Sequence, residues 1–279
     1  MNKGVCALCL CVLALTSGWA EGGGEYLYLF MRAGAYAERG DYDNAIADYT
    51  AALEIEPDYA EALFNRGHAY KSRGDTDKAI ADYTAALEIK PDYVEALNNR
   101  GVEYIARGDV ANAIADYTAA LKIKPDFAEA LNNRGNAYAT KGDAFKAVDD
   151  YTAALKIKPD YAEARYNRGT VYYHWGERDR AIADYTAALE IDPDFLEALN
   201  NRGSVYAGKG DIDNAMADFN AALGIKPDFY EALNNRGIAY YNVGDLDRAI
   251  ADWEEVLRIN PNHANAQQYI ETARQKRGY

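Results

Sequence analysis

The sequence predicts an all-α fold built as one linear array of repeated helix pairs. All seven prolines of the 279-residue chain lie 34 residues apart, and a glycine recurs midway between them. Between these markers, apolar residues follow the three and four residue spacing of amphipathic helices. Length alone would suggest two domains of about 150 residues each. The strict period favours a single repeat array instead.

The first twenty residues differ from the rest of the chain and predict a secretory signal peptide. Lys3 gives a positive start, residues 5–15 form an apolar run, and small residues up to Ala20 suit cleavage. The run is too short to span a bilayer, which needs about 20 apolar residues. A lipidated Cys11 is the alternative, which Leu10 before it disfavours because a small residue is expected there.

The composition narrows the expected compartment and partners. All three cysteines lie within the signal peptide, so we expect no disulfide, thiolate zinc site or cysteine nucleophile in the mature chain. A formal net charge of -14 with few basic clusters excludes the basic face that nucleic acids require. We therefore expect an exported protein, periplasmic or secreted, without a membrane span in the mature chain. Residues 21–25 are interpreted as a linker.

Seven copies of the repeat follow the linker, each predicted to hold two helices of about 13 residues. A polar tail is predicted to form a C-terminal capping helix on the last copy. The copies span 26–59, 60–93, 94–127, 128–161, 162–195, 196–229 and 230–263, and the capping helix spans 264–279.

The breaks between helices have a backbone explanation. Gly74 and its counterparts are predicted to end the first helix in a left-handed conformation. An acidic residue such as Asp75 follows and is predicted to cap the second helix. At the other junction proline disfavours continuation of the helix. The next residues, Asp58 and Glu61 in the first such junction, are interpreted as a capping box.

Several columns recur in every copy and are predicted to hold the helices together. Arginines such as Arg66 and aspartates such as Asp82 are expected to form a ladder of ion pairs, since a partly buried arginine needs a carboxylate. An exposed arginine row that binds acidic ligands is the alternative. Tyrosines such as Tyr70 and Tyr83 are predicted core residues. Glycines such as Gly67 are expected to let the first helix approach the alanines of the second.

The order Gly, Tyr, Gly-Asp, Ala, aromatic, Ala, Pro at fixed places in 34 residues resembles the tetratricopeptide repeat, from Tyr26 to His263. The resemblance implies a right-handed superhelical solenoid with a concave groove that binds a protein or peptide partner. The arginine column departs from the family, which often has a large aliphatic residue there.

By this resemblance, the inward-facing positions of the first helices fall mostly on asparagines, which offer both a donor and an acceptor to an extended peptide. Hydrogen bonding of these amides to neighbouring helices is the open alternative. Glutamates such as Glu95 stand where a lysine clamp for chaperone tails would be, which disfavours that ligand. With residues from variable columns and the divergent fifth copy, the expected groove residues are Asn65, Asn98, Asn99, Asn132, Asn133, Asn136, Tyr166, Asn167, Tyr173, His174, Trp175, Asn200, Asn201, Asn234, Asn235 and Tyr241.

The first copy opens on an apolar segment with no repeat before it, and such a patch often marks an interface. We expect end-to-end self-association or a docked partner through Tyr26, Tyr28, Leu29 and Phe30.

The sequence offers little chemistry beyond binding. His68, His174 and His263 lie far apart without metal-ligand spacing, and no phosphate loop or pair of catalytic carboxylates is evident. We therefore expect no enzymatic activity and no cofactor or metal. The favoured function is a protein-protein interaction scaffold of the bacterial cell envelope. The alternative is a transport accessory protein that docks a solute-binding protein and handles a small ligand.

Overall fold

The computed structural model describes residues 24–278, and every regular element in that range is an α-helix. The predicted signal peptide and residues 21–23 of the predicted linker lie outside the described residues. The chain divides into two compact units, the first ending at Lys141 and the second starting at Gly142. This division falls inside the fourth 34-residue segment, between its two helices.

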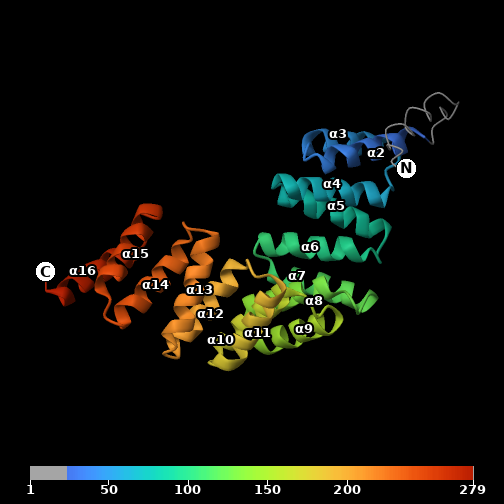
Figure 1. Cartoon of the computed structure of the whole chain (residues 1–279). Helices are drawn as coiled ribbons and strands as arrows, with labels where there is room; N and C mark the ends of the chain where they lie inside the picture. Colours follow the sequence, from blue (N-terminus) through green and yellow to red (C-terminus); the bar gives the residue numbers. More distant parts are fainter. Residues whose placement is uncertain (1–23, 279) are drawn as a thin grey trace, which may run out of the picture. The chain divides into compact units, whose positions relative to one another are not determined.

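Each unit is a run of helices joined by short turns (Figure 1). The first unit holds α2 Glu25–Glu38, α3 Tyr42–Ile55, α4 Ala60–Arg73, α5 Thr76–Ile89, α6 Val94–Ala106, α7 Val110–Ile123 and α8 Ala128–Lys141. The second holds α9 Ala144–Ile157, α10 Ala162–His174, α11 Arg178–Ile191, α12 Leu196–Gly208, α13 Ile212–Ile225, α14 Tyr230–Asn242, α15 Leu246–Ile259 and α16 Ala266–Arg277.

Consecutive helices pack side by side in both units. In the first unit α2 packs against α3, α4 against α5 and α6 against α7, and each second helix also contacts the first helix of the next repeat. The first helices touch one another as well, so that α2, α4, α6 and α8 form one row. In the second unit α10, α12 and α14 form the equivalent row. The predicted all-α array of tandem helix pairs is confirmed.

The turn inside each repeat has the predicted chemistry. Gly74 ends α4 at a φ of 86°, in the left-handed region where a side chain is disfavoured. The glycines with positive φ at these turns are Gly40, Gly74, Gly108, Gly142, Gly176, Gly210 and Gly244. Asp41 then accepts a hydrogen bond from the backbone N–H of Asn44, and the equivalent cap forms at Asp109, Asp143, Asp211 and Asp245. Asp75 and Glu177 make no such cap.

The predicted capping box at the proline junction is wrong. The N-cap of α4 is Tyr59, one residue after Asp58, and its side chain makes no cap hydrogen bond. The corresponding N-caps of α6, α10, α12 and α14 are Tyr93, Tyr161, Phe195 and Phe229, also without a side-chain cap. The aspartate therefore stands one residue too early for the capping box geometry. The aromatic N-caps instead contribute rings to the packing between repeats.

Glycines inside the first helices make room for an aromatic ring. A Cβ on Gly101 would lie 2.6 Å from Cε1 of Tyr117, which is closer than packed atoms can stand. Gly67, Gly169, Gly203 and Gly237 meet the rings of Tyr83, Tyr185, Phe219 and Trp253 in the same way. The expected partner was the alanine column. The alanines are buried, but the ring is what requires the glycine.

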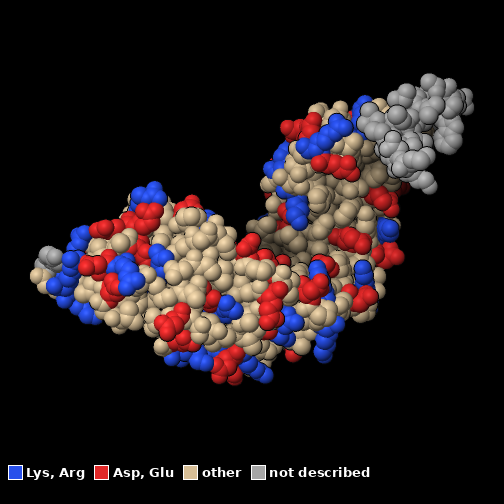
Figure 2. Space-filling model, viewed as in Figure 1, with Lys and Arg blue, Asp and Glu red and all other residues tan. Residues whose placement is uncertain are grey.

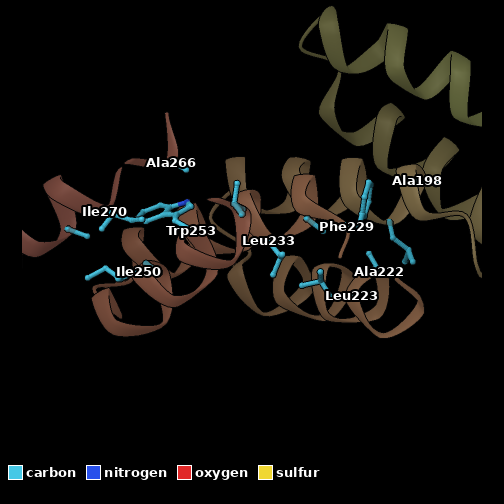
Figure 3. Close-up of a cluster of buried hydrophobic side chains, with 14 of the residues drawn as sticks. Ala198, Ala222, Leu223, Phe229, Leu233, Ile250, Trp253, Ala266 and Ile270 are labelled. Atoms are coloured by element: carbon cyan, nitrogen blue, oxygen red, sulfur yellow. The ribbon is translucent and has the colours of Figure 1, made fainter. Parts of the chain in front are cut away.

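The C-terminal helix completes the core of the second unit. Trp253 is 2% exposed and packs on Tyr269 of α16 with ring centroids 5.2 Å apart. Ala266 and Ile270 on α16 join the buried cluster that Figure 3 shows together with Leu233 and Ile250. Ala273 of α16 belongs to the same cluster. The predicted capping role of the tail helix rests on these contacts. No helix within residues 24–278 has the length and apolar character needed to cross a membrane.

In six repeats, an arginine on the first helix holds an aspartate on the second helix of the same repeat. Nε of Arg100 donates to Oδ2 of Asp116 at 2.7 Å and Nη2 donates to Oδ1 at 2.8 Å. The predicted ladder is confirmed by this bidentate geometry at Arg32–Asp48, Arg66–Asp82, Arg100–Asp116, Arg168–Asp184, Arg202–Asp218 and Arg236–Asp252.

The ladder arginines also reach the preceding repeat, which the sequence did not predict. Nη1 of Arg100 donates to Oγ1 of Thr84 at 3.1 Å, and Nη1 of Arg236 donates to Oδ1 of Asn220 at 2.7 Å. The hydrogen bond to Asp116 outweighs desolvation and raises the pKa of Arg100, which therefore stays charged. Outside the ladder, acidic and basic side chains are interspersed on the face that Figure 2 shows.

Candidate functional site

The groove face is defined here as the surface of the first helices at the two positions before each ladder arginine, together with the next turn of each helix. In the first unit these two positions hold Phe30 and Met31, Phe64 and Asn65, Asn98 and Asn99, and Asn132 and Asn133. In the second unit they hold Tyr166 and Asn167, Asn200 and Asn201, and Asn234 and Asn235. The rows of first helices bring successive pairs next to one another within each unit.

Hydrogen bonds join these amides from repeat to repeat. In the first unit Nδ2 of Asn133 donates to Oδ1 of Asn98 at 3.1 Å. In the second unit Nδ2 of Asn235 donates to Oδ1 of Asn200 at 2.9 Å, and Nδ2 of Asn201 donates to the hydroxyl of Tyr166 at 3.1 Å. The alternative prediction, that these amides form hydrogen bonds to neighbouring helices, is therefore true of Asn133, Asn201 and Asn235.

The two asparagines of a pair differ in burial. Asn132 is 0% exposed, Asn98 is 9% exposed and Asn200 is 8% exposed. These three were expected to contact a partner. Asn132 is fully enclosed, whereas Asn98 lines the hollow described below. The second members, such as Asn133, are only half-buried. The first asparagine of one repeat thus orients the second asparagine of the next repeat, and that second asparagine is partly exposed to solvent.

The amide series ends at the last repeat. Oδ1 of Asn234 is buried and has no hydrogen-bond partner among the described residues. In earlier repeats the N–H donor comes from the asparagine 35 residues further along the chain. For Asn234 that position is occupied by Tyr269 on α16. An aromatic residue at this place leaves the carbonyl unsatisfied, and it changes the surface from amide to ring.

A hollow on the groove face of the first unit brings predicted residues together with two unpredicted rings. It is lined by Phe64, Asn65, His68, Glu95, Asn98, Asn99 and Phe127. Partial burial and the nearby Lys71 ammonium lower the pKa of His68, so its imidazole is mainly neutral at pH 7. The hollow therefore offers amide groups, aromatic edges and one carboxylate to a ligand.

A second hollow lies between α14, α15 and α16 in the second unit. It is lined by Ile238, Tyr241, Trp253, Asn265, Gln268, Tyr269 and Thr272. Tyr241 was predicted as a groove residue, and Lys276 of α16 stacks over its ring at 4.3 Å. The wall here is more aromatic than in the first unit, because α16 replaces the asparagine pair with Gln268 and Tyr269.

An ion pair between a buried glutamate and a half-buried lysine lies next to the first hollow. Glu103 of α6 is 4% exposed, in a column that holds alanine or valine in the other described repeats. Nζ of Lys71 lies 4.0 Å from its Oε1. Lys71 is thereby held toward α6, and its column varies from repeat to repeat, with Ile105, Ala139, Tyr173, Ala207 and Tyr241 in the later copies.

The divergent fifth repeat does not place all its aromatic residues on the groove face. Tyr173 follows Tyr166 by seven residues, about two helical turns, and so shares its face; its side chain is 43% exposed. Trp175 is the C-cap of α10, nine residues after Tyr166 and about half a turn away from that face. Its ring packs on Phe145 of α9 with centroids 4.9 Å apart. The assignment of Trp175 to the groove is therefore corrected to the turn side of the unit.

The remaining predicted residues lie on the first helices. His174 is exposed next to Tyr173, with ring centroids 5.5 Å apart. Asn136 and Asn167 are half-buried, on α8 and α10. Nδ2 of Asn65 donates to the backbone carbonyl of Glu61 at 2.8 Å, which fixes its amide on α4.

The predicted N-terminal interface is partly used inside the first repeat. Tyr26 packs on Tyr59 with centroids 5.4 Å apart, and Phe30 packs on Tyr59 at 4.9 Å and on Tyr49. Arg32 stacks over the ring of Tyr28. The large apolar side chains left exposed on α2 are Leu27 at 39% and Met31 at 48%. A contact at this end would involve these two residues, with Tyr28 and Leu29 half-buried beside them.

Sequence reasoning missed Phe64, Phe127 and Phe145. The signal for Phe64 was present, because its column holds asparagine in four repeats and an aromatic residue in three. Phe145 likewise stands in a column that holds aspartate in five of the seven repeats. Departures from the commonest residue of a repeat column are thus informative about the surface.

Among residues 24–278 there is no group of three or more His, Cys, Asp or Glu side chains arranged to hold a metal ion.

Comparison with known families and structures agrees with the geometry. The family described as "TPR repeat" matches residues 34–72, 101–142, 141–176 and 203–244, and the family described as "Tetratricopeptide repeat" matches 60–93, 162–195 and 230–263. A search of curated proteins gave no match.

Solved structures of similar fold include several repeat proteins. A tetratricopeptide repeat protein from Parabacteroides merdae is 22% identical with a TM-score of 0.70, over 90% of this chain and 99% of that chain. MamA is 32% identical with a TM-score of 0.54, over 58% of this chain and 94% of its own. YrrB, described as a TPR protein with an unusual peptide-binding site, is 24% identical with a TM-score of 0.55, over 67% of this chain and 96% of its own. The helix pairs, their 34-residue period and these matches together show that the chain belongs to the tetratricopeptide repeat family.

Proposed function

We propose that this protein is a non-enzymatic scaffold of the bacterial cell envelope that binds an extended segment of a partner protein on its groove face. Proteins of this family generally mediate protein-protein interactions, and YrrB is described as having a peptide-binding site. The groove face offers amides and aromatic edges, and it offers no nucleophile with an adjacent base. We propose neither a cofactor nor a nucleic acid as a ligand.

The observation that carries the proposal is the bond from Asn235 to Asn200, repeated from Asn133 to Asn98. An amide that is already oriented loses little conformational freedom when a ligand binds. Each carboxamide has two N–H donors and a carbonyl with two lone pairs. Asn133 therefore has one N–H donor and its carbonyl left for the backbone of an extended peptide. Asn235 also donates to Oγ of Ser204 at 3.2 Å, so it offers its carbonyl to a peptide N–H.

The proposed location follows from the N-terminal sequence. A signal peptide at residues 1–20 would deliver the mature chain to the periplasm or the medium. Within that compartment the partner would be an envelope protein with a flexible segment. Its backbone, which every sequence shares, would provide the contacts to the amides, and the hollows beside them would select side chains.

The test compares groove variants with matched controls. A displayed library of random peptides is selected on the wild-type protein, and the affinity of the enriched peptides is measured for Asn133→Ala and Asn235→Ala. Each variant loses about one hydrogen bond to the ligand, or about 1 kcal/mol, so affinity should fall roughly fivefold. Asn112→Ala and Asn214→Ala are the controls, because these asparagines donate to cap residues on exposed turns.

Equal affinity of the groove variants and the controls for every enriched peptide would overturn the proposal. Circular dichroism of each variant, with thermal unfolding, excludes loss of fold as the cause of weaker binding.

A further inference from the structure

The turn edge, defined here as the surface where first helices end and second helices begin, carries a second set of contacts between repeats. Nη1 of Arg73 lies 2.6 Å from Oδ1 of Asp43, thirty residues earlier in the chain. The same thirty-residue spacing joins Arg107 to Asp77 at 3.6 Å. Ion pairs with this spacing also form between Lys209 and Asp179 and between Arg277 and Asp247. In each pair, the basic residue lies at the end of the first helix of a repeat or, for Arg277, of the capping helix. The acidic residue lies at the start of the second helix of the preceding repeat.

An aromatic pair occupies this position between the fourth and fifth repeats. Phe145 and Trp175 are thirty residues apart, and their rings pack at a centroid distance of 4.9 Å and an interplanar angle of 42°. Both residues lie in the second unit. Two large apolar side chains thus replace a charged pair on a surface where the other pairs are solvated.

Phe145 and Trp175 leave more apolar surface exposed to solvent than packing between the repeats explains. Phe145 is 77% exposed, the largest value among the exposed large apolar side chains of the described residues, and Trp175 is 38% exposed. The corresponding position in the third repeat holds Ala111. A small residue is therefore compatible with the repeat at this position, and Phe145 leaves most of its apolar surface in water. Exposed aromatic clusters with polar surroundings are typical of protein contact sites.

The charges around the aromatic pair are unusual for this acidic chain. Arg178 and Arg180 on the first turn of α11 are exposed, and neither has an ion pair with a carboxylate of the described chain. The carboxylate between them, Asp179, is paired with Lys209. Arg180 stacks over Tyr172 at 4.9 Å, and the ring of Tyr172 meets Trp175 edge-on at 6.1 Å. Contacts thus connect Phe145 through Trp175 and Tyr172 to the guanidinium group of Arg180.

We propose that Phe145, Tyr172, Trp175, Arg178 and Arg180 form a docking surface for an acidic segment of a partner protein that carries a large apolar side chain. The Phe145 and Trp175 rings would take that side chain, and the two guanidinium groups would take carboxylates beside it, with bidentate geometry. Lys146 pairs with Asp143. Glu177 is the N-cap of α11 without a side-chain cap hydrogen bond, and among the described residues it forms no ion pair with Arg178 or Arg180.

This surface is separate from the groove face. Trp175 lies about half a turn away from Tyr166 on α10, and none of the five residues lines either hollow. The inference does not depend on groove binding. A single protein could therefore engage two partners, or two segments of one partner.

The test uses a variant that replaces the aromatic pair with the ion pair of the other repeats. In Phe145→Asp with Trp175→Arg, the thirty-residue pair becomes the aspartate and arginine found at Asp43 and Arg73, so the fold has a built-in replacement contact. A displayed library of random peptides is selected on the full chain, and each enriched peptide is measured against this double variant, against Arg178→Glu with Arg180→Glu, and against Asn235→Ala.

We expect a class of peptides in which carboxylates flank a large apolar residue. Its affinity should fall at least tenfold in the double variant and in the Arg178→Glu, Arg180→Glu variant, should weaken as salt rises, and should be unchanged in Asn235→Ala. Failure to recover such a class would overturn the proposal, as would unchanged affinity in the double variant. A wild-type dimer in sedimentation that the double variant abolishes would identify a second copy as the occupant and would also contradict the acidic partner. None of these outcomes tests peptide binding at the groove face. That binding is tested by the affinity of the enriched peptides for Asn235→Ala.

Discussion

The guanidinium of Arg100 and the carboxylate of Asp116 meet side-on across one helix pair, with both side chains more than four-fifths buried at 17% and 9% exposure. In the first repeat Arg32 makes the same bond to Asp48, but the side chain of Arg32 is 43% exposed. The ladder thus contains two ion pairs of the same chemistry, one buried at Arg100–Asp116 and one with a solvent-exposed arginine at Arg32–Asp48. Because water screens an exposed pair, the two ion pairs should contribute differently to stability.

Removal of one ladder carboxylate should therefore have a position-dependent effect. Asp116→Ala leaves a buried guanidinium without its partner and should lower the free energy of unfolding by about 3 kcal/mol. Asp48→Ala removes the partner of a solvated arginine and should cost about 1 kcal/mol. Urea unfolding followed by circular dichroism measures both. Equal losses at the two ion pairs would contradict the burial argument.

A methyl group on the interior glycine of α6 should destabilise the first unit. The Cβ of Gly101→Ala would lie 2.6 Å from Cε1 and 2.9 Å from Cζ of Tyr117. Overpacking of this kind should lower the free energy of unfolding by about 2 kcal/mol. Gly224→Ala is the matched control, since nothing lies within 4 Å of the added Cβ on α13. That change should raise stability by about 0.5 kcal/mol through helix propensity. The midpoint temperature of thermal unfolding should fall in Gly101→Ala and rise in Gly224→Ala.

Buried tyrosines should make the fold sensitive to alkali. Burial raises the pKa of Tyr49 to about 12, from an ordinary value of 10.0, with Glu38 adding to the effect. The folded state keeps the phenol proton where the unfolded state loses it. The stabilisation is therefore complete below pH 10 and is lost as the pH rises from 10 through 12. Over that interval this group contributes a slope of about 1.4 kcal/mol per pH unit.

Tyr49→Phe checks the assignment of that slope, because it removes the titrating group and keeps the ring. The free energy of unfolding, measured between pH 9 and pH 11.5, should fall less steeply in the variant. Identical slopes in the two proteins would show that Tyr49 titrates normally.

The predicted signal peptide can be tested without the structure. Expression of residues 1–279 in a bacterium should yield a product that begins at Glu21 and is found in the periplasmic fraction or the medium. Intact mass and N-terminal sequencing read the cleavage site. A cytoplasmic product that retains Cys6, Cys9 and Cys11 would contradict export. A mass increase from acyl chains at Cys11 would support the lipoprotein alternative.

The repeat register allowed much of the fold to be predicted from the sequence. A column of Arg100 with a column of Asp116 indicated the ladder, and Gly74 followed by Asp75 indicated the turn. Contacts between repeats were harder to predict, because a period reveals which positions are equivalent but not which columns face each other. The bond from Arg100 to Thr84 and the burial of Asn132 depend on how one repeat rotates against the next.

The corrections have the same origin. Trp175 was assigned to the groove because it shares a helix with Tyr166, and the phase of the last turn places it elsewhere. The capping box at Asp58 failed because the helix starts one residue later than the motif requires, with Tyr59 as its N-cap. A local motif does not include the tertiary contacts that shift a helix boundary.

The most direct test of groove binding follows the asparagine side chains themselves. On the isotopically labelled protein, the side-chain NH2 resonances of Asn99, Asn133, Asn201 and Asn235 are recorded as a peptide enriched in the groove selection is added. We predict that these four signals shift with saturation at the measured affinity, while those of Asn112 and Asn214 on the turn edge stay in place. Tight peptide binding with all four groove amides unmoved would contradict the account.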